Sequence, residues 1–173
     1  ACGRRAVRRV AGTHPVQRFG EPGRRHLLDG RSGQLELTAN DRVDILGVGL
    51  DPLARDALIP AVETLVNDGG AHTVTYVNVH VLNQAFGDPT LRAFLDQADL
   101  VYCDGNGVRL GARLLGERLP DRMTGADWIW DLAAAAEGRW RLYWIGGDPG
   151  VTDAAAVAVQ QHHPRLAIGT DHG

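Results

Sequence analysis

From residue 42 onward, short apolar segments alternate with longer segments of helical periodicity, and this alternation limits the fold more than any other feature. The predicted strands cover 43–48, 72–79, 100–103 and 141–145, and a last one begins at 164. The predicted helices cover 52–67, 88–97, 108–115, 127–137 and 151–162. Strands that alternate with helices indicate a Rossmann-like α/β domain, with a mostly parallel sheet and helices on both faces.

Residues 1–40 differ from the rest in charge and in periodicity. They hold eight arginines and three acids, a net charge of +5, whereas the remainder holds ten arginines and eighteen acids, a net charge of −8. The segment has few large apolar residues, so we expect a disordered Arg/Gly-rich arm followed by one domain over 41–173. Phe19 is the only aromatic residue in the arm, and nucleic-acid binding is therefore not predicted.

The sequence also restricts where such a protein works. It has no run of about 18 apolar residues that would cross a bilayer, and nothing in it resembles the apolar core of a signal peptide. Cys2 and Cys103 lie far apart and suggest no disulfide framework. We expect a cytoplasmic protein, and peripheral contact with the inner face of the membrane is compatible with this expectation.

In parallel sheets, ligands bind beyond the carboxyl ends of the strands, and one such position carries a carboxylate. Asp104-Gly105-Asn106-Gly107 follows the apolar segment 100–103 directly. Asp104 could act as a general base toward a sugar hydroxyl, beside glycines that admit a ligand close to the backbone. It could equally cap the next helix, and spacing by itself favours the cap.

Two further polar side chains permit two interpretations each. Arg122 could grip a phosphate through two parallel hydrogen bonds, or pair with Asp121 or Asp127 on the surface. Asn78, at the end of a predicted strand, could contact a base or a hydroxyl, or could satisfy a turn.

A glycine-rich turn, Gly146-Gly147-Asp148-Pro149-Gly150, joins a strand to a helix. Free N–H groups at a helix N-terminus suit a diphosphate, but the same residues also make an ordinary tight turn with Pro at the first helical position. The spacing matches neither the P-loop nor the dinucleotide fingerprint, and Gly47-Val48-Gly49 lacks the third glycine of the latter. No cluster with zinc-ligand spacing occurs, so no metal and no cofactor is predicted.

Taken in order, these segments resemble bacterial glycosyltransferase family 26, the WecG/TagA/CpsF type. The resemblance covers about residues 42–173 and rests on an ordered set of short motifs rather than on any single one. The motifs are Ile45-Leu46-Gly47-Val48 with Asp51, Val77-Asn78, Ala98-Asp99-Leu100-Val101, Asp104-Gly105-Asn106-Gly107-Val108, Ala112-Arg113-Leu114-Leu115-Gly116, Asp121-Arg122-Met123-Thr124-Gly125-Ala126-Asp127, Gly146-Gly147-Asp148-Pro149-Gly150 and Gly169-Thr170-Asp171-His172-Gly173.

The resemblance implies an inverting, metal-independent transferase. The donor is a UDP-linked N-acetylmannosamine-type sugar or its uronic acid, and the acceptor is a lipid-diphosphate-linked amino sugar in surface polysaccharide or teichoic acid synthesis. It implies Asp104 as the general base and Arg122 as the group that stabilises the leaving diphosphate. It also implies a wider set of contacts. The substrate-binding residues would be Tyr76, Asn78, Gly105, Asn106, Gly107, Thr124, Gly125 and Asp127, and the nucleotide-binding residues Gly146, Gly147 and Gly150.

Two departures from the family pattern qualify this reading. Tyr76 stands where the family often has Thr, which indicates a different acceptor preference. Family members also continue beyond the His-Gly pair, so we expect a domain truncated at its C-terminus. The alternative hypothesis is a catalytically incomplete nucleotide-binding or assembly module derived from the family, and a homo-oligomer is left open.

Overall fold

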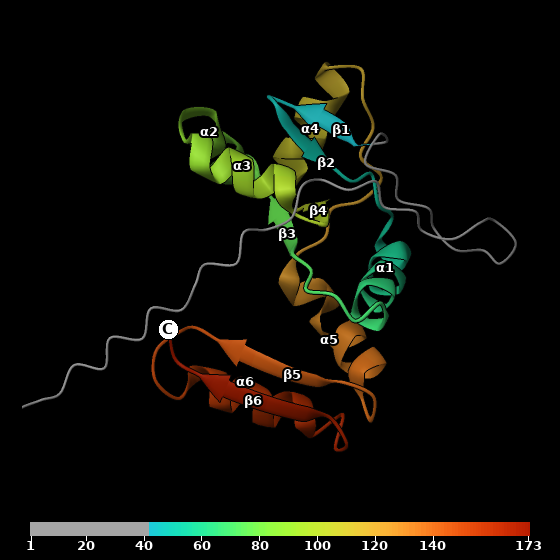
Figure 1. Ribbon diagram of the computed structural model, residues 1–173, viewed down its shortest axis with the longest axis vertical. Coiled ribbons are helices and arrows are strands. Elements are labelled where there is room, and N and C mark those ends of the chain that lie inside the picture. Colours follow the sequence, from blue (N-terminus) through green and yellow to red (C-terminus); the bar gives the residue numbers. More distant parts are fainter. Residues whose placement is uncertain (1–41) are drawn as a thin grey trace, which may run out of the picture.

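The computed structural model describes residues 42–173, which form six helices and six short strands (Figure 1). The predicted arm over 1–40 and the domain start at residue 41 lie outside the described residues. The strands are β1 Val43–Ile45, β2 Val48–Leu50, β3 Val74–Val77, β4 Leu100–Cys103, β5 Arg141–Ile145 and β6 Ala167–Asp171. The helices are α1 Arg55–Asn67, α2 Val79–Gly87, α3 Pro89–Gln97, α4 Asn106–Leu114, α5 Gly125–Ala136 and α6 Val151–Gln160. None of these described helices is long and apolar enough to cross a bilayer.

The α/β prediction is confirmed, but the expected single parallel sheet is not what residues 42–173 form. They make three two-stranded sheets: β3–β4 and β5–β6 are parallel, and β1–β2 is antiparallel. The predicted strand 43–48 was wrong because Leu46 and Gly47 both take positive φ and turn the chain into a hairpin. The Gly47 N–H donates to the Asp44 carboxylate at 3.1 Å, which closes this turn.

Helices cover both faces of the β3–β4 pair, as the sequence predicts for its sheet. Successive strand residues point to opposite faces, so the pair contributes to two cores. Val77, Val101 and Cys103 pack with β1, β2, α2, α3 and α4. Leu100 and Tyr102 pack with α1, Met123 and Trp128 of α5.

Helix α5 connects this part of the molecule to the β5–β6 pair. On one side it packs against α1, and the Arg139 guanidinium just beyond it pairs with Glu63 of α1 at 2.5 Å. Farther along, Ala133 and Ala136 pack against Val159 of α6 and Leu166. Figure 1 accordingly shows α5 between the two parallel pairs.

Helix α1 begins later than predicted and α2 was not predicted, whereas the ends of α3 to α6 differ from the predicted ones by at most two residues. Helix α1 begins at Arg55 rather than at 52, and its first N–H donates to the Asp121 carboxylate at 2.9 Å, a cap from a distant segment. Helix α2 was not predicted at all, because its first residue was assigned to the preceding valine-rich strand. Asn78 starts this helix, since its side chain accepts a hydrogen bond from the Val81 N–H at 3.0 Å.

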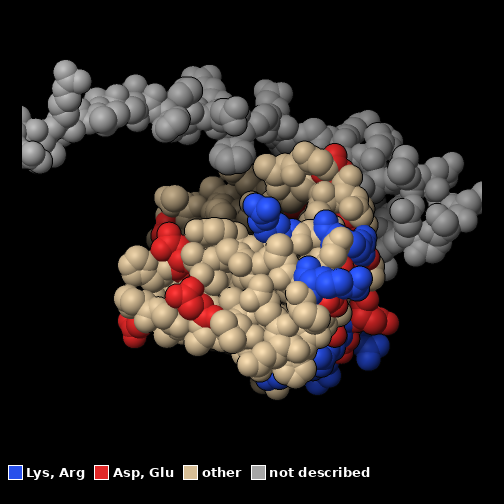
Figure 2. All heavy atoms as spheres, turned by 90° about the horizontal axis from the view of Figure 1, so that it is seen from below, with Lys and Arg blue, Asp and Glu red and all other residues tan. Residues whose placement is uncertain are grey.

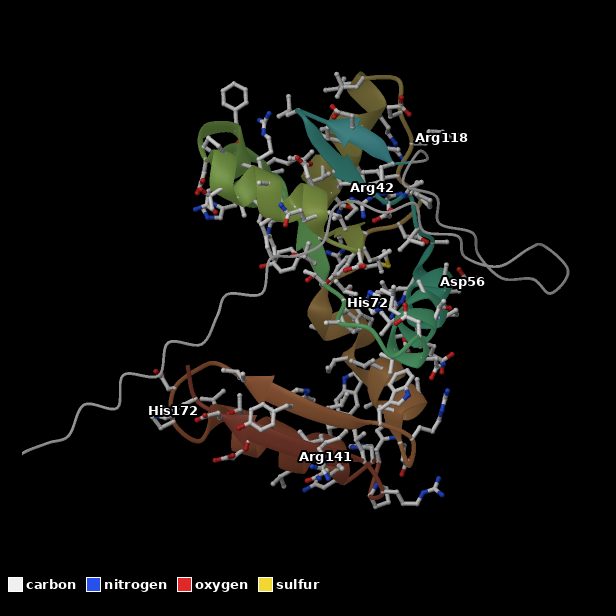
Figure 3. All side chains as sticks on the ribbon, in the orientation of Figure 1. Arg42, Asp56, His72, Arg118, Arg141 and His172 are labelled. Carbon is white, nitrogen blue, oxygen red and sulfur yellow. The ribbon has the colours of Figure 1, made fainter. Side chains whose placement is uncertain are left out.

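A buried carboxylate joins the β1–β2 hairpin to β4. Asp51 is only 5% exposed, and its carboxylate accepts hydrogen bonds from the Val101 N–H at 2.6 Å and the Arg42 Nε at 3.0 Å. Its own N–H donates to the Val101 carbonyl at 2.8 Å. Arg42 also donates to the Ala98 carbonyl at 2.8 Å, so it lies where the hairpin meets the segment before β4 (Figure 3).

We expect Asp51→Ala to lower the free energy of unfolding by about 3–5 kcal/mol, because it leaves a largely buried guanidinium and a buried N–H without their acceptor. Asp51→Asn keeps one acceptor oxygen and should cost less. Urea denaturation measures both. Asp96→Ala, at an exposed position of α3, is the matched control and should change stability by less than about 0.5 kcal/mol. Equal losses of stability in Asp51→Ala and Asp96→Ala would contradict the role assigned to the buried Asp51 carboxylate.

Candidate functional site

Asn78 and Asp104 follow two neighbouring parallel strands and therefore lie at one edge of the sheet. Val77 and Cys103 are register partners, and the Asp104 N–H donates to the Val77 carbonyl at 2.9 Å. This is the carboxyl end of β3–β4, where parallel sheets bind ligands. The structure thus brings together two side chains that are 26 positions apart in the sequence.

The segment that carries Arg122 runs beside the same end of β4. The Met123 N–H donates to the carbonyl of Cys103, the last residue of β4, at 2.9 Å. Arg122 and Thr124 are therefore held next to the strand end from which Asp104 follows. The Arg122 side chain is 45% exposed, so its guanidinium can still reach a ligand.

Asp104 does not cap the helix that follows it. The N-cap of α4 is Gly105, which has φ +143°, and no side chain makes a capping hydrogen bond there. Within residues 42–173 the Asp104 carboxylate has no hydrogen-bond or ion-pair partner. Both of its oxygens can therefore accept a hydrogen bond from a ligand hydroxyl group. The interpretation of Asp104 as a helix cap is wrong.

Asp127 has a different environment from Asp104. It forms a capping box with Thr124 at the start of α5, and its carboxylate lies 3.5 Å from Arg122. The hydrogen bonds from Thr124 lower the pKa of Asp127 most, and the nearby Arg122 and Arg55 lower it further. Of the two partners that the sequence offered Arg122, the structure selects Asp127, and Asp127 therefore orients this arginine.

Gly107 allows two helices to start side by side at this edge. A Cβ atom on Gly107 would lie 2.5 Å from Cγ2 of Val79, the first residue of α2. Only a hydrogen fits there, so the first turns of α2 and α4 are in contact beside Asn78 and Asp104. Their N-terminal N–H groups, which have no acceptor within the helix, favour negative charge at this edge.

Three aromatic side chains form a row that approaches the site. The rings of Tyr76 and Tyr102 are 6.2 Å apart, and Tyr102 meets Trp128 edge-on at 6.1 Å. The Trp128 Nε1 donates to the Tyr102 hydroxyl at 3.3 Å. Burial raises the pKa of Tyr102, and the negative charge of Asp104 raises it further. Tyr76, at the other end of the row, is 43% exposed and can contact a ligand.

The predicted nucleotide-binding glycines lie at the end of the other strand pair. Gly150 is the N-cap of α6, and the Gly146 N–H is already bonded to the Asp171 carbonyl at 3.2 Å. Acidic side chains lie on this side of the molecule, where Figure 3 places His172, while the opposite side carries arginines together with further acidic side chains (Figure 2). Diphosphate binding by Gly146, Gly147 and Gly150 stays a prediction, and this charge distribution does not favour it.

Sequence reasoning missed two contributors to the site, Arg55 and Tyr102. Arg55 donates through Nη2 to the Asp127 carbonyl at 3.1 Å, and Asp121 caps the helix to which Arg55 belongs. These contacts join positions that are 72 and 66 residues apart, so no local pattern marks them. Tyr102 was assigned to a buried strand without any relation to Asp104.

Comparison with known proteins identifies the family of this chain. A family model described as "Glycosyl transferase WecG/TagA/CpsF family" matches residues 43–173. The chain belongs to the WecG/TagA/CpsF family. The WecG/TagA/CpsF match includes the carboxyl end of β3–β4, to which the sequence resemblance assigned Asn78 and Asp104.

Named relatives come from Staphylococcus aureus. Proteins from strains NCTC 8325 / PS 47, COL and MRSA252 are each called N-acetylglucosaminyldiphosphoundecaprenol N-acetyl-beta-D-mannosaminyltransferase, and each is 25% identical to this chain over 135 residues. The alignment covers 76% of this chain and 53% of each relative. This WecG/TagA/CpsF chain thus spans about half the length of the curated relatives it matches.

We expect Gly107→Ala to destabilise the domain by about 1–3 kcal/mol, because the new methyl group overlaps Val79. Gly111→Ala in the same helix meets open space and should be neutral or stabilise by up to about 1 kcal/mol. Adding Val79→Ala to Gly107→Ala should restore much of the loss. Chemical denaturation of the wild type and the three variants measures these changes in stability. Equal stability of Gly107→Ala and Gly111→Ala would refute the close contact between Gly107 and Val79.

Proposed function

We propose that this chain is the catalytic part of an inverting glycosyltransferase. The sugar transferred is of the N-acetylmannosamine type, the donor is its UDP derivative, and the acceptor is an amino sugar linked to a lipid through a diphosphate. Family membership and the names of the relatives support this class of reaction. The observation that carries the proposal is a partly exposed carboxylate, Asp104, which has no hydrogen-bond or ion-pair partner within residues 42–173 and follows the strand end beside which the Arg122 segment runs.

In this proposal Asp104 is the general base. Its carboxylate removes the proton from the acceptor hydroxyl as the hydroxyl oxygen attacks the anomeric carbon of the donor. A carbon–oxygen bond forms on one face of the sugar while the bond to UDP breaks on the other, so the configuration inverts. The Asp104 side chain suits this step because no hydrogen bond or ion pair within residues 42–173 occupies its oxygens.

Arg122 offsets the charge that develops on the departing UDP. Asp127 holds the guanidinium at 3.5 Å from one side, and the exposed part of the group stays available to phosphate oxygens. The adjacent first turns of α2 and α4 add N–H groups of the same polarity. A fixed cation in this position supplies the charge stabilisation that the reaction requires without a metal ion.

Tyr76, Asn78, Thr124 and the glycines of the Asp104 loop belong to the same proposed site. Asn78 directly follows β3, the strand that pairs with β4, and Tyr76 lies in β3, so both lie at the sheet edge that carries Asp104. The side-chain oxygen of Asn78 is engaged by α2, which leaves its NH₂ group to contact the substrate. We assign Tyr76 to the acceptor side, where its ring can lie against a sugar face.

Asp104→Asn should lower kcat by about 10²- to 10⁴-fold and leave KM little changed, because the amide cannot take the proton. The measurement is release of UDP from a UDP-linked N-acetylmannosamine donor in the presence of a lipid-diphosphate acceptor. Asp96→Asn on exposed α3 is the control. Near-normal transfer by Asp104→Asn would refute the general-base assignment.

Arg122→Ala should lower kcat by about 10²- to 10³-fold. It should also weaken UDP binding about tenfold or more, since a charge-assisted contact is lost. Arg122→Lys keeps the charge but not the paired donors and should lie in between. Calorimetric titration with UDP, with and without magnesium, measures the affinity, and exposed Arg141→Ala is the control. Unchanged affinity and turnover in Arg122→Ala would remove the phosphate role.

A further inference from the structure

Helix α4 has apolar side chains on its outer face as well as on its inner face. Val108 and Ala112 are buried against β1 and the core. Leu110 is 58% exposed, Leu114 80% and Leu115 58%, and Leu114 is the most exposed large apolar side chain among residues 42–173. Leu110 and Leu114 are four positions apart and share one face, so the outer side of α4 presents a leucine patch to solvent.

Two arginines that have no partner among residues 42–173 flank these leucines. Arg113 lies in the last turn of α4 and Arg118 follows in the loop, where Figure 3 shows it at the periphery of the molecule. In the part of the chain that the structure describes, neither makes a hydrogen bond or an ion pair. Glu117 is the one acid in this segment, and Arg109 is occupied by the Leu119 and Pro120 carbonyls.

We propose that the outer face of α4, with Leu110, Leu114 and Leu115 flanked by Arg113 and Arg118, docks the domain on an anionic lipid bilayer. The leucines enter the boundary between head groups and acyl chains, and the arginines bind lipid phosphates. A second copy of the chain fits less well. A symmetric contact through this patch would gather four arginines, Arg113 and Arg118 of each copy, at one interface, with one Glu117 from each copy to offset them.

The position of the patch suits the proposed function, on which this inference rests. Helix α4 starts two residues after Asp104, and at 1.5 Å per residue Leu114 lies about 12 Å farther along the axis. Docking through Leu110 and Leu114 would hold Asp104 a short distance from the lipid surface. A sugar joined to a lipid through a diphosphate could reach Asp104 without leaving the bilayer.

Co-sedimentation with vesicles tests the proposal. The 173-residue chain is mixed with vesicles of phosphatidylglycerol and phosphatidylcholine in equal parts, or of phosphatidylcholine alone. Leu110→Gln/Leu114→Gln and Arg113→Gln/Arg118→Gln should each weaken binding to the anionic vesicles roughly tenfold or more. Val157→Gln on exposed α6 and Arg165→Gln after it are the matched controls and should bind like the wild type. Circular dichroism verifies that every variant is folded.

Every variant keeps the eight arginines of residues 1–40, so any binding by that segment is the same throughout. The proposal is overturned if both double variants bind anionic vesicles as tightly as the wild type does. It is also overturned if the wild type does not bind anionic vesicles. Light scattering measures whether the patch instead binds a second copy of the chain. If Leu110→Gln/Leu114→Gln dissociates a dimer and leaves vesicle binding unchanged, the patch belongs to a second copy and the proposal fails.

Transfer to a water-soluble acceptor analogue separates this proposal from the proposed function. The patch variants should transfer sugar to that analogue at the wild-type rate, because they leave Asp104 and Arg122 untouched. A chain that binds vesicles through the patch but transfers no sugar would refute the function and keep the docking surface. A chain that transfers sugar but binds no vesicles would refute the docking surface alone.

Discussion

The buried carboxylate of Asp51 holds the described domain together at its centre. Its side chain accepts from the Val101 N–H while its own N–H donates to the Val101 carbonyl, so one residue provides both bonds of a strand pairing. Arg42 neutralises the charge that this arrangement buries and adds a bond to the Ala98 carbonyl. A parallel pair of four-residue strands has little stability by itself, and the Asp51 segment gives β4 a second neighbour besides β3.

The same edge of β4 then positions the candidate site. Asp51 pairs with Val101, and two residues farther along Met123 pairs with Cys103, so the segment that carries Arg122 continues the line begun by Asp51. The Asp121 carboxylate caps α1, which fixes the other side of that segment. Asp104 and Arg122 therefore depend on one strand, β4, which is held by contacts from a segment before it in the sequence, at Asp51, and from one after it, at Met123.

Local signals explain what could be predicted from the sequence. β5 was predicted with its observed boundaries, and β4 with Asp104 at its end, because each apolar run stops at an abrupt polar or glycine turn. Helix α2 was missed because Val74 to Val81 is rich in valine and has strand character on either side of Asn78. The contacts of Asp51 with Val101 and of Arg55 with Asp121 join positions 50 and 66 residues apart, and no periodicity reveals them.

Asp104 and Asp127 illustrate why residue type alone could not distinguish the proposed base from other carboxylates. Asp127 already accepts from Thr124 and faces Arg122, and these interactions lower its pKa and stabilise the ionised form. A carboxylate stabilised in this way is a poor proton acceptor, but it orients a guanidinium well. Asp104 lacks such partners in the described chain and stands close enough to Tyr102 to help raise the pKa of that phenol. The proposed roles rest on these two environments: Asp104 has no hydrogen-bond or ion-pair partner among residues 42–173, whereas Asp127 pairs with Arg122.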